Sequence, residues 1–569
     1  MRLVVPLVLS LVLAVTIESV AWSQPAASAG PKAMVAAANP AAVEAGLAVL
    51  RRGGTALDAA VAVQATLGLV EPQSSGVGGG AFLIWYDSKT HRVTAYDGRE
   101  TAPAAATPDQ FLHPDGKPMS YGEAVLSGRS AGVPGAIAML YLAHKDHGKL
   151  PWPSLFGDAE QLAEQGFVVG PRLIGELQYP APQNKAPDVI AYFKGPDGGP
   201  LKAGERLKNP AYAATLRKIA AEGPDALLKG KIAADIVTRL AQEPLPGALT
   251  LADMAAYAPR RSAALCRPYR MWTVCVPPPP AGGTATLIGL GILQNTDIAA
   301  HGPADPQGWF ELAQAERLMY ADDLRYVADP AFVRVPVDGL LDPAYLAERA
   351  KLIGDRAGPA PEPGHPKGAP TYGPDATKEP GGTSSFVVVD RWGNVVAMTT
   401  TVESLFGDGR MVDGFFINNQ LTDFSFDPKT KDGTPAANAV APGKRPRSSM
   451  SPTIILDKDG KFVTGIGSPG GLQIPSFVLK GVIGVLDWKL TMQQAVTLPN
   501  LVAIGDNFIS EPEKYPPGVA EGLAARGVVL KTGRGVEDSG LHGVIARPNG
   551  LEGGADPRRE GVAIGCCAP

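Results

Sequence analysis

Thr383 is the residue best suited to nucleophilic chemistry. It stands directly after two glycines in the stretch GGTSSFVVVDRWGNVVAMTTTVESLFGDG, residues 381–409. A hydroxyl is a poor nucleophile without an adjacent base. One available base is the amino group of the same residue, whose ordinary pKa of about 7.7–8.0 leaves it substantially neutral near physiological pH. That chemistry requires Thr383 to become the first residue of a chain, so we hypothesise a cut between Gly382 and Thr383.

The segment that precedes Thr383 suits such a cut. Residues 355–382, DRAGPAPEPGHPKGAPTYGPDATKEPGG, are rich in Pro, Gly and charge, which is typical of a mobile linker rather than of core. The Gly-Gly end gives the exposure and backbone freedom that an internal N-to-O acyl shift needs. On the residues alone, a Thr after glycines is more often the ordinary start of a strand.

Two predicted hairpins must position this residue. The first joins an alternating strand at 383–389 to a returning strand at 395–402. The second joins 453–456 to 462–466 and ends in the turn sequence GSPGG. Helical patterns dominate the chain before about residue 355. We therefore expect an α/β fold with a mostly antiparallel sheet.

The first two predicted helices carry clear start signals. Asn39 precedes a proline at the first helical position, and Thr55 with Asp58 forms a capping box. The second of these helices is rich in Ala and Val, so we expect it to bury most of its surface. A Gly-rich turn, SSGVGGGAF, then leads into a strand at 81–86.

Composition excludes some partners. The 569 residues include 67 Gly and 54 Pro, spread along the chain, and the formal net charge is -4. No basic stripe is visible, so neither nucleic acid nor an anionic membrane surface is an expected partner.

The amino terminus predicts export. Arg2 precedes an apolar run at residues 3–15, and Ala21-Trp22-Ser23 suits a small-x-small cleavage site. A run of about 13 residues is short of the roughly 20 that span a bilayer. We predict a signal peptide at residues 1–23 and a periplasmic or secreted protein.

The four cysteines leave one pairing open. Cys266 and Cys275 flank RPYRMWTV, which is short enough to form one hairpin, so they pair in an oxidising compartment or remain as two buried thiols. The adjacent Cys566 and Cys567 form neither a CxxC motif nor a zinc set. We assign no metal to them.

A series of motifs in order resembles the gamma-glutamyltransferase family of N-terminal-nucleophile hydrolases. The likeness runs from about residue 31 to residue 565. It includes NPAAVEAGLAVLRRGGTALDAAVAV, SSGVGGGAF, YDGRETAP, SAGVPGAIA, PPPPAGGTATL, INNQLTDFS, GKRPRSSMSPTII and GSPGG, besides the stretch around Thr383. The resemblance implies a four-layer αββα sandwich with central, mostly antiparallel sheets, and it implies no cofactor. It also implies two intertwined chains from one precursor, a large subunit at 24–382 and a small subunit at 383–569.

The resemblance assigns the catalytic roles. Thr383 falls at the nucleophile, which the family frees by autocatalytic cleavage after the preceding residue, here Gly382. Thr401 matches a second threonine whose hydroxyl orients the nucleophile. Gly470 and Gly471 match the backbone N–H pair of the oxyanion hole.

The resemblance also describes a pocket for an amino acid. Arg99, in DGRE, matches the arginine that grips the glutamyl α-carboxylate, and a guanidinium fork suits that group. Ser448 and Ser449 match a serine pair that hydrogen-bonds the same carboxylate. Gln420 and Asp423 match residues that receive the α-ammonium.

Two departures from the family pattern concern this pocket. Glu403 stands where the family usually has Asn, so we expect Glu403 and Asp423 to share the α-ammonium. The segment at 424–447 is shorter than in members with a long lid and lacks the lid tyrosine. An open site admits water and bulky acceptors, so we expect hydrolysis to compete strongly with transfer.

The predicted activity is transfer of the γ-glutamyl group of glutathione and related compounds, through an enzyme-bound ester, to water, amino acids or peptides. A glutaryl-type (cephalosporin) acylase of the same family is the alternative. A more distant alternative is a serine hydrolase that uses Ser130, because Gly128–Gly132 matches GxSxG. A non-enzymatic binding protein is favoured only if the precursor is never cut.

Overall fold

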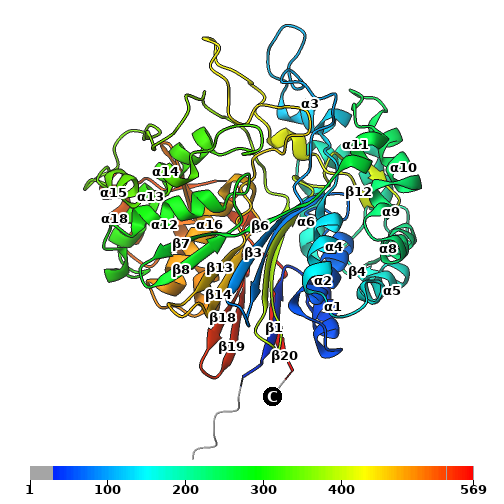
Figure 1. Cartoon of the computed structure of the whole chain (residues 1–569), viewed down its shortest axis with the longest axis horizontal. Coiled ribbons are helices and arrows are strands. Elements are labelled where there is room, and N and C mark those ends of the chain that lie inside the picture. Colours follow the sequence, from blue (N-terminus) through cyan, green and yellow to red (C-terminus); the bar gives the residue numbers. More distant parts are fainter. Residues whose placement is uncertain (1–29, 534, 568–569) are drawn as a thin grey trace, which may run out of the picture.

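The computed structural model describes residues 30–533 and 535–567. The predicted signal peptide at 1–23 lies outside the described residues. Two large antiparallel sheets stand side by side at the centre, with helices outside them (Figure 1). The expected mixed α/β class with antiparallel sheets is confirmed. In the described part of the chain, no helix combines the length and apolarity that crossing a membrane requires.

The first sheet holds the predicted nucleophile. Its seven strands, in spatial order, are β20 (Val562–Cys566), β1 (Ala33–Ala37), β9 (Thr383–Val389), β10 (Val395–Thr401), β2 (Gly80–Asp87), β3 (Arg92–Asp97) and β6 (Arg260–Ala263). The predicted hairpin is β9 with β10, and its register sets Thr383 opposite Thr401. Thr401 also lies opposite Gly80 on β2.

The second sheet contains the other predicted hairpin. Its six strands, in spatial order, are β19 (Gly550–Ala555), β18 (His542–Arg547), β14 (Phe462–Gly467), β13 (Thr453–Leu456), β8 (Trp272–Val276) and β7 (Leu265–Tyr269). Cys266 and Cys275 face each other across β7 and β8 and form a disulfide. Cys566 and Cys567 are free thiols.

The two sheets pack on each other through an apolar layer. Val387 and Val389 of β9 belong to this layer, together with Ile454 of β13 and Val544 of β18. Phe386 and Val388, the alternate residues of β9, face the opposite side and join a core with helices. This period of two follows from the pleat of a strand. Burial on both faces explains why β9 is apolar from Phe386 to Val389.

Helices cover the outer face of each sheet. The first sheet packs against α1 (Pro40–Arg51), α2 (Ala56–Val70) and α4 (Ala136–His147). The second packs against α12 (Gly283–Leu293), α13 (Pro306–Tyr326) and α16 (Ile474–Leu486) (Figure 1). The predicted N-cap at Asn39 and the capping box of Thr55 with Asp58 are confirmed.

Further helices and short strands complete the fold. The other helices are α3 (Tyr121–Val125), α5 (Gly157–Gln165), α6 (Pro171–Gln178), α7 (Pro187–Tyr192), α8 (Pro210–Glu222), α9 (Asp225–Leu228), α10 (Gly230–Leu240), α11 (Leu251–Ala256), α14 (Val337–Leu340), α15 (Pro343–Ala350), α17 (Met492–Thr497) and α18 (Val519–Ala525). The short strands are β4 (Phe167–Val168), β5 (Arg206–Leu207), β11 (Met411–Val412), β12 (Phe415–Phe416), β15 (Leu501–Ile504), β16 (Asn507–Ser510) and β17 (Lys531–Thr532). Short 3₁₀ turns include η1 (Gly128–Ser130), η4 (Ile298–Ala300), η5 (Gln420–Asp423) and η6 (Gly471–Gln473).

The segment at 355–382 is only partly the linker that its composition predicts. It contains no helix or strand, as expected. Its last residues, however, are anchored. The carboxylate of Glu379 lies 3.0 Å from a guanidinium nitrogen of Arg447, and the carbonyl of Glu379 accepts a hydrogen bond from the Leu472 amide at 3.0 Å. A buried ion pair and a backbone hydrogen bond therefore hold this end in the uncut chain, and the mobility of the segment stays a prediction.

Candidate active site

Thr383 and Thr401 meet at the open end of the β9–β10 hairpin. The hydroxyl of Thr383 donates a hydrogen bond to the hydroxyl oxygen of Thr401 at 3.2 Å. Both side chains are buried. The contact follows from strand register, since directly opposed residues of an antiparallel pair point to the same face.

Thr401 also touches the peptide bond that precedes Thr383. Its hydroxyl donates to the carbonyl oxygen of Gly382 at 2.6 Å and accepts from the Glu403 amide at 2.7 Å. A Cβ on Gly382 would lie 2.4 Å from the carbonyl oxygen of Glu403, so only glycine fits there. One hydroxyl thus contacts both groups that would react in a cut between Gly382 and Thr383.

A small cavity of about 20 Å³ adjoins these threonines, which is room for about one water molecule. Its lining brings together most of the residues predicted from the sequence, and it adds others that were not. The lining residues are Arg99, Glu379, Pro380, Thr383, Thr401, Glu403, Gln420, Asp423, Ser448, Ser449, Met450, Gly471 and Ile474.

The uncut chain itself fills much of this site. The Ser449 amide donates to the carboxylate of Glu379 at 3.2 Å. A Cβ on Gly471 would lie 2.2 Å from the Glu379 carbonyl oxygen and 2.6 Å from that of Pro380. The residues just before the predicted cut therefore occupy the space beside the nucleophile. Sequence reasoning missed Glu379, because it treated 355–382 as a linker. It also missed Arg447, which lies outside that segment.

Arg99 is held in place by its own neighbours. Its guanidinium donates to Asp423 Oδ2 at 2.6 Å and to the carbonyl oxygens of Pro446 and Arg447. Both side chains of the Arg99–Asp423 pair are buried. Ser448, which also lines the cavity, accepts a hydrogen bond from the Met450 amide.

Several residues that line the cavity offer hydrogen-bond acceptors. Gln420 and Asp423 come from η5, where the Gln420 amide group donates to Asp423 Oδ2 at 2.6 Å. Besides Oε1 of Glu379, which is paired with the Arg447 guanidinium, three buried oxygens of the described lining have no hydrogen-bond donor: Oε1 of Glu403, Oδ1 of Asp423 and Oε1 of Gln420. Burying acceptors without donors is unfavourable. A bound group with several N–H donors would therefore satisfy these oxygens.

Glu403 is held in a strained position. Its backbone φ is 84°, in the region that favours glycine. Its Oε2 accepts hydrogen bonds from the Tyr121 hydroxyl at 2.9 Å and from the Asn419 amide group. Burial, and then the neighbouring Asp423 carboxylate, hold the pKa of Glu403 well above its usual range. Such a shift, in a cavity and with backbone strain, is typical of a functional group.

Tyr121 and Asn419 are the other site residues that the sequence did not reveal. Asn419 adjoins Gln420 in the motif INNQLTDFS, so its position in that motif was an available signal. Tyr121 comes from α3, far away in the sequence, and only the fold brings it to Glu403.

Gly470 and Gly471 both adopt positive φ, 131° and 57°. Gly471 lines the cavity, whereas Gly470 stands beside it, where a Cβ would lie 2.5 Å from the Phe477 ring. Both positions therefore require glycine. Their role as oxyanion donors stays a prediction.

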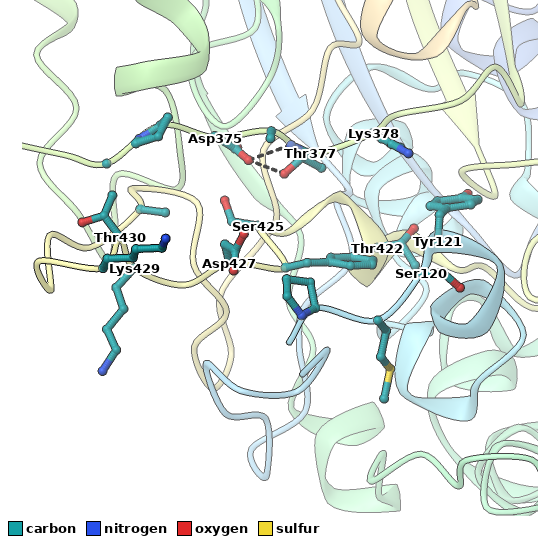
Figure 2. A pocket seen from close by; sticks show the side chains of 18 residues that line it. Ser120, Tyr121, Asp375, Thr377, Lys378, Thr422, Ser425, Asp427, Lys429 and Thr430 are labelled. Carbon is teal, nitrogen blue, oxygen red and sulfur yellow. Dashed lines mark hydrogen bonds between the residues drawn. The ribbon is translucent and has the colours of Figure 1, made fainter. Parts of the chain in front are cut away.

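A larger pocket of about 550 Å³ is lined in part by Tyr121, whose hydroxyl bonds to Glu403 of the small cavity. Figure 2 shows Asp375 and Thr377 on one side of it and Ser425 and Asp427 on the other. One wall is thus made by the segment before the predicted cut. The rest of the lining comes from the short segment at 424–447, from Thr422 and from residues 118–121.

Ser130 lies in the 3₁₀ turn η1, without a strand leading into it. Its hydroxyl donates to the carbonyl oxygens of Ser127 at 2.8 Å and of Val125 at 3.1 Å. Both are acceptors that cannot remove its proton. The GxSxG match therefore lacks the geometry of a serine nucleophile.

Comparisons with known proteins agree with these features. A sequence profile described as gamma-glutamyltranspeptidase matches residues 42–566. The glutathione hydrolase proenzyme of Bacillus subtilis (strain 168) is 38% identical over 555 residues, which cover 94% of this chain and 92% of that one. The acylase ACY 1 proenzyme of Pseudomonas sp. (strain SE83) is 33% identical and covers 94% of each chain. The solved structure of a cephalosporin acylase from Bacillus halodurans superposes with a TM-score of 0.81 at 26% identity, covering 97% of this chain and 99% of that one.

Proposed function

The chain belongs to the gamma-glutamyltranspeptidase family of enzymes, and we propose that it is a self-cleaving gamma-glutamyltransferase and glutathione hydrolase. Its substrates would be glutathione and related γ-glutamyl compounds, and its acceptors water, amino acids or peptides. The four-layer αββα sandwich of N-terminal-nucleophile hydrolases is the corresponding fold. Two packed antiparallel sheets with helices outside each of them support this assignment.

One observation carries the choice of substrate. The three buried oxygens without donors, on Glu403, Asp423 and Gln420, line the same cavity as the cationic Arg99, which pairs with the other carboxylate oxygen of Asp423. A free α-amino acid group offers three N–H donors on one side and a carboxylate on the other. The ammonium would satisfy the three acceptors, and the guanidinium would face the carboxylate. A γ-glutamyl group carries both the α-ammonium and the α-carboxylate, so it can pair with the acceptors and with the guanidinium.

Activation begins with an N-to-O acyl shift. Oγ1 of Thr383 attacks the carbonyl carbon of Gly382, the C–N bond breaks, and the amine of Thr383 receives the proton that the hydroxyl loses. Thr401 supports both partners, because it accepts from the Thr383 hydroxyl and donates to the Gly382 carbonyl oxygen. Water then hydrolyses the ester, which leaves a free amine on Thr383 and a carboxylate on Gly382.

Turnover uses the amine that the cut releases. It takes the proton from the Thr383 hydroxyl, whose oxygen attacks the γ-carbonyl carbon of the substrate. The backbone N–H groups of Gly470 and Gly471 would hold the oxyanion, and the leaving amine would depart with the proton. Water or an acceptor amine then attacks the γ-glutamyl ester and restores Thr383. The residues named here supply each step without a cofactor.

The mature protein would be two chains, residues 24–382 and 383–569, exported to the periplasm or secreted. Relatives described as proenzymes support processing of one precursor. The Cys266–Cys275 disulfide suits an oxidising compartment.

A glutaryl-type acylase is the second candidate, because an acylase is among the relatives and a cephalosporin acylase among the similar structures. A glutaryl group lacks the α-ammonium, so it would leave the acceptors of Glu403, Asp423 and Gln420 without donors. That mismatch favours the γ-glutamyl substrate. Kinetics on matched γ-glutamyl and glutaryl anilides tests the choice.

A further inference from the structure

A second cluster of chemistry-bearing side chains lies far along the chain from the active-site residues. Asp297 precedes η4, His301 follows it, and Glu311 lies on α13. One ligand-type atom of each side chain lies within 4.8 Å of the others. In the described residues this is the one such group of three. We propose that these three residues bind a zinc-class divalent metal ion.

His301 is oriented as a metal ligand would be. Its Nδ1 lies 2.7 Å from Oδ2 of Asp305, which can accept the proton of that nitrogen. Nε2 then carries the free lone pair. It is buried and lies 3.3 Å from Oδ1 of Asp297, but it makes no hydrogen bond within the described part of the molecule. A carboxylate behind the histidine is the usual support of a metal-ligating imidazole.

Glu311 supplies the second, independent observation. Its side chain belongs to a residue only 3% exposed. Oε1 accepts a hydrogen bond from the Gln307 side chain at 2.6 Å, which leaves Oε2 as a buried oxygen without a hydrogen-bond partner among the described residues. The carboxylate of Asp297 beside it adds repulsion. A cation between the two would remove both penalties.

The donor set favours zinc over calcium or magnesium. An imidazole nitrogen with two carboxylate oxygens suits zinc, whereas calcium and magnesium prefer oxygen alone. Bonds of about 2.0–2.2 Å place tetrahedral ligand atoms roughly 3.4 Å apart. The distance of 3.3 Å between Asp297 and His301 already matches. Asp297 is largely exposed, so water can take the fourth position.

The site would tie the two predicted chains together. Arg526, just after α18, donates to Gln307, and Gln307 in turn donates to Glu311. Arg526 belongs to the predicted small subunit, and the other two residues belong to the large one. A metal ion that fixes Glu311 would therefore also fix the groups that hold α18 against α13.

The test uses the full-length protein without a histidine tag, with Cys566 and Cys567 both changed to Ser so that the vicinal thiols cannot bind the metal. After treatment with EDTA, Zn²⁺ is added alone and binding is measured by calorimetry, with melting followed in parallel. We expect one Zn²⁺ per chain with micromolar or tighter affinity and a higher melting temperature. Mg²⁺ and Ca²⁺ at the same concentration should do neither.

Ligand variants give the decisive comparison. His301→Ala, Asp297→Asn and Glu311→Gln should each weaken Zn²⁺ binding at least tenfold. His113→Ala is the matched control, because His113 is an exposed histidine beside a carboxylate, 3.6 Å from Glu123, and lies outside the proposed metal site. It should bind Zn²⁺ as the parent does.

Two results would overturn the proposal. The first is the absence of Zn²⁺ binding below millimolar concentration, or binding that all three ligand variants retain. The second is that Glu311→Gln is more stable than the metal-free parent and that Zn²⁺ stabilises neither the variant nor the parent. That result would show that Asp297 and Glu311 share a proton instead of a metal ion.

Discussion

The hydroxyl of Thr401 donates a 2.6 Å hydrogen bond to the carbonyl oxygen of Gly382, the residue before the predicted cut. The same hydroxyl accepts from Thr383, whose oxygen would attack that carbonyl. One side chain is therefore placed to polarise the proposed electrophile and to orient the proposed nucleophile. Its position follows from the register of β9 and β10, so the hairpin brings together the residues of the proposed cleavage site.

Thr401→Val should slow processing of the precursor. Valine keeps the shape of threonine but removes the hydrogen bond to an oxygen that gains negative charge in the acyl shift. Such bonds are worth about 1.5–3 kcal/mol, so we expect cleavage to slow roughly 10- to 100-fold. The time course of cleavage on denaturing gels measures it. Thr401→Ser should restore most of the rate, and a Val variant that matures at the normal rate would remove Thr401 from the mechanism.

Thr383→Ala should give an uncut and inactive precursor, because one hydroxyl drives both cleavage and turnover. The active protein should instead run as two bands of about 37 and 19 kDa, at the mean residue mass of the chain. Amino-terminal sequencing should find Thr383 at the start of the smaller band.

Ser130→Ala is the matched control for that experiment. Its hydroxyl bonds only to backbone carbonyls, so the variant should keep both cleavage and activity. A single uncut band from fully active protein, or loss of activity in the serine variant alone, would favour the serine-hydrolase hypothesis.

Glu403→Gln should weaken turnover of γ-glutamyl substrates by about 1.5–3 kcal/mol, the range for hydrogen bonds to charged groups. Glutamine can still accept from Tyr121 and Asn419, but it cannot lose a proton to become a carboxylate that pairs with the ammonium. Glutaryl substrates should be spared or improved. Steady-state kinetics on the two matched anilides would show this as a change in their ratio.

Glu316→Gln is the matched control for Glu403→Gln. Glu316 is also a buried carboxyl group whose pKa burial raises well above the usual range, but it lies on α13 away from the cavity. Glu316→Gln should leave the turnover of both anilides unchanged. Equal losses on both anilides in Glu403→Gln would mean that Glu403 does not recognise the ammonium.

Glu403→Gln should also change the pH dependence of the stability of the fold. A raised pKa means that the folded state holds the Glu403 proton more tightly than the unfolded state does. The resulting stability is fully present below about pH 4.5 and is lost as pH rises through the folded pKa. Glu403→Gln removes this loss, so its melting temperature should fall less steeply with pH and exceed that of the parent near pH 8. Differential scanning fluorimetry across pH 5–8 measures this, and parallel curves would contradict it.

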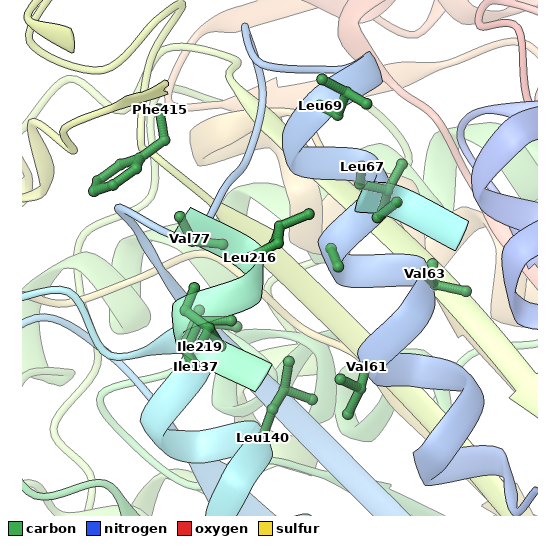
Figure 3. Close-up of a cluster of buried hydrophobic side chains, with 14 of the residues drawn as sticks. Val61, Val63, Leu67, Leu69, Val77, Ile137, Leu140, Leu216, Ile219 and Phe415 are labelled. Atoms are coloured by element: carbon green, nitrogen blue, oxygen red, sulfur yellow. The ribbon is translucent and has the colours of Figure 1, made fainter. Parts of the chain in front are cut away.

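Local signals in the sequence predicted the helices and hairpins well. The capping box before α2 marked its start, and its Ala- and Val-rich composition indicated burial. Figure 3 shows Val61, Val63, Leu67 and Leu69 of α2 packed in a core with residues from other helices. Strand order could not be predicted, because pairings such as β1 with β20 join the two ends of the chain and leave no local signal.

Motifs predicted most residues of the candidate site, and the residues that they missed are held there by contacts that only the fold creates. Tyr121 reaches Glu403 from a remote helix, and Glu379 enters the cavity from a segment whose composition predicts a linker. The pairing of Cys266 with Cys275, left open by the sequence, is settled by hairpin geometry.

The most direct test of the account compares kcat/KM of the processed enzyme for L-γ-glutamyl-p-nitroanilide and glutaryl-p-nitroanilide, which differ only in the α-ammonium. Three buried acceptors on Glu403, Asp423 and Gln420 without donors predict a preference for the γ-glutamyl compound of at least about tenfold. Equal rates, or faster release from the glutaryl compound, would contradict the proposed substrate and favour the acylase.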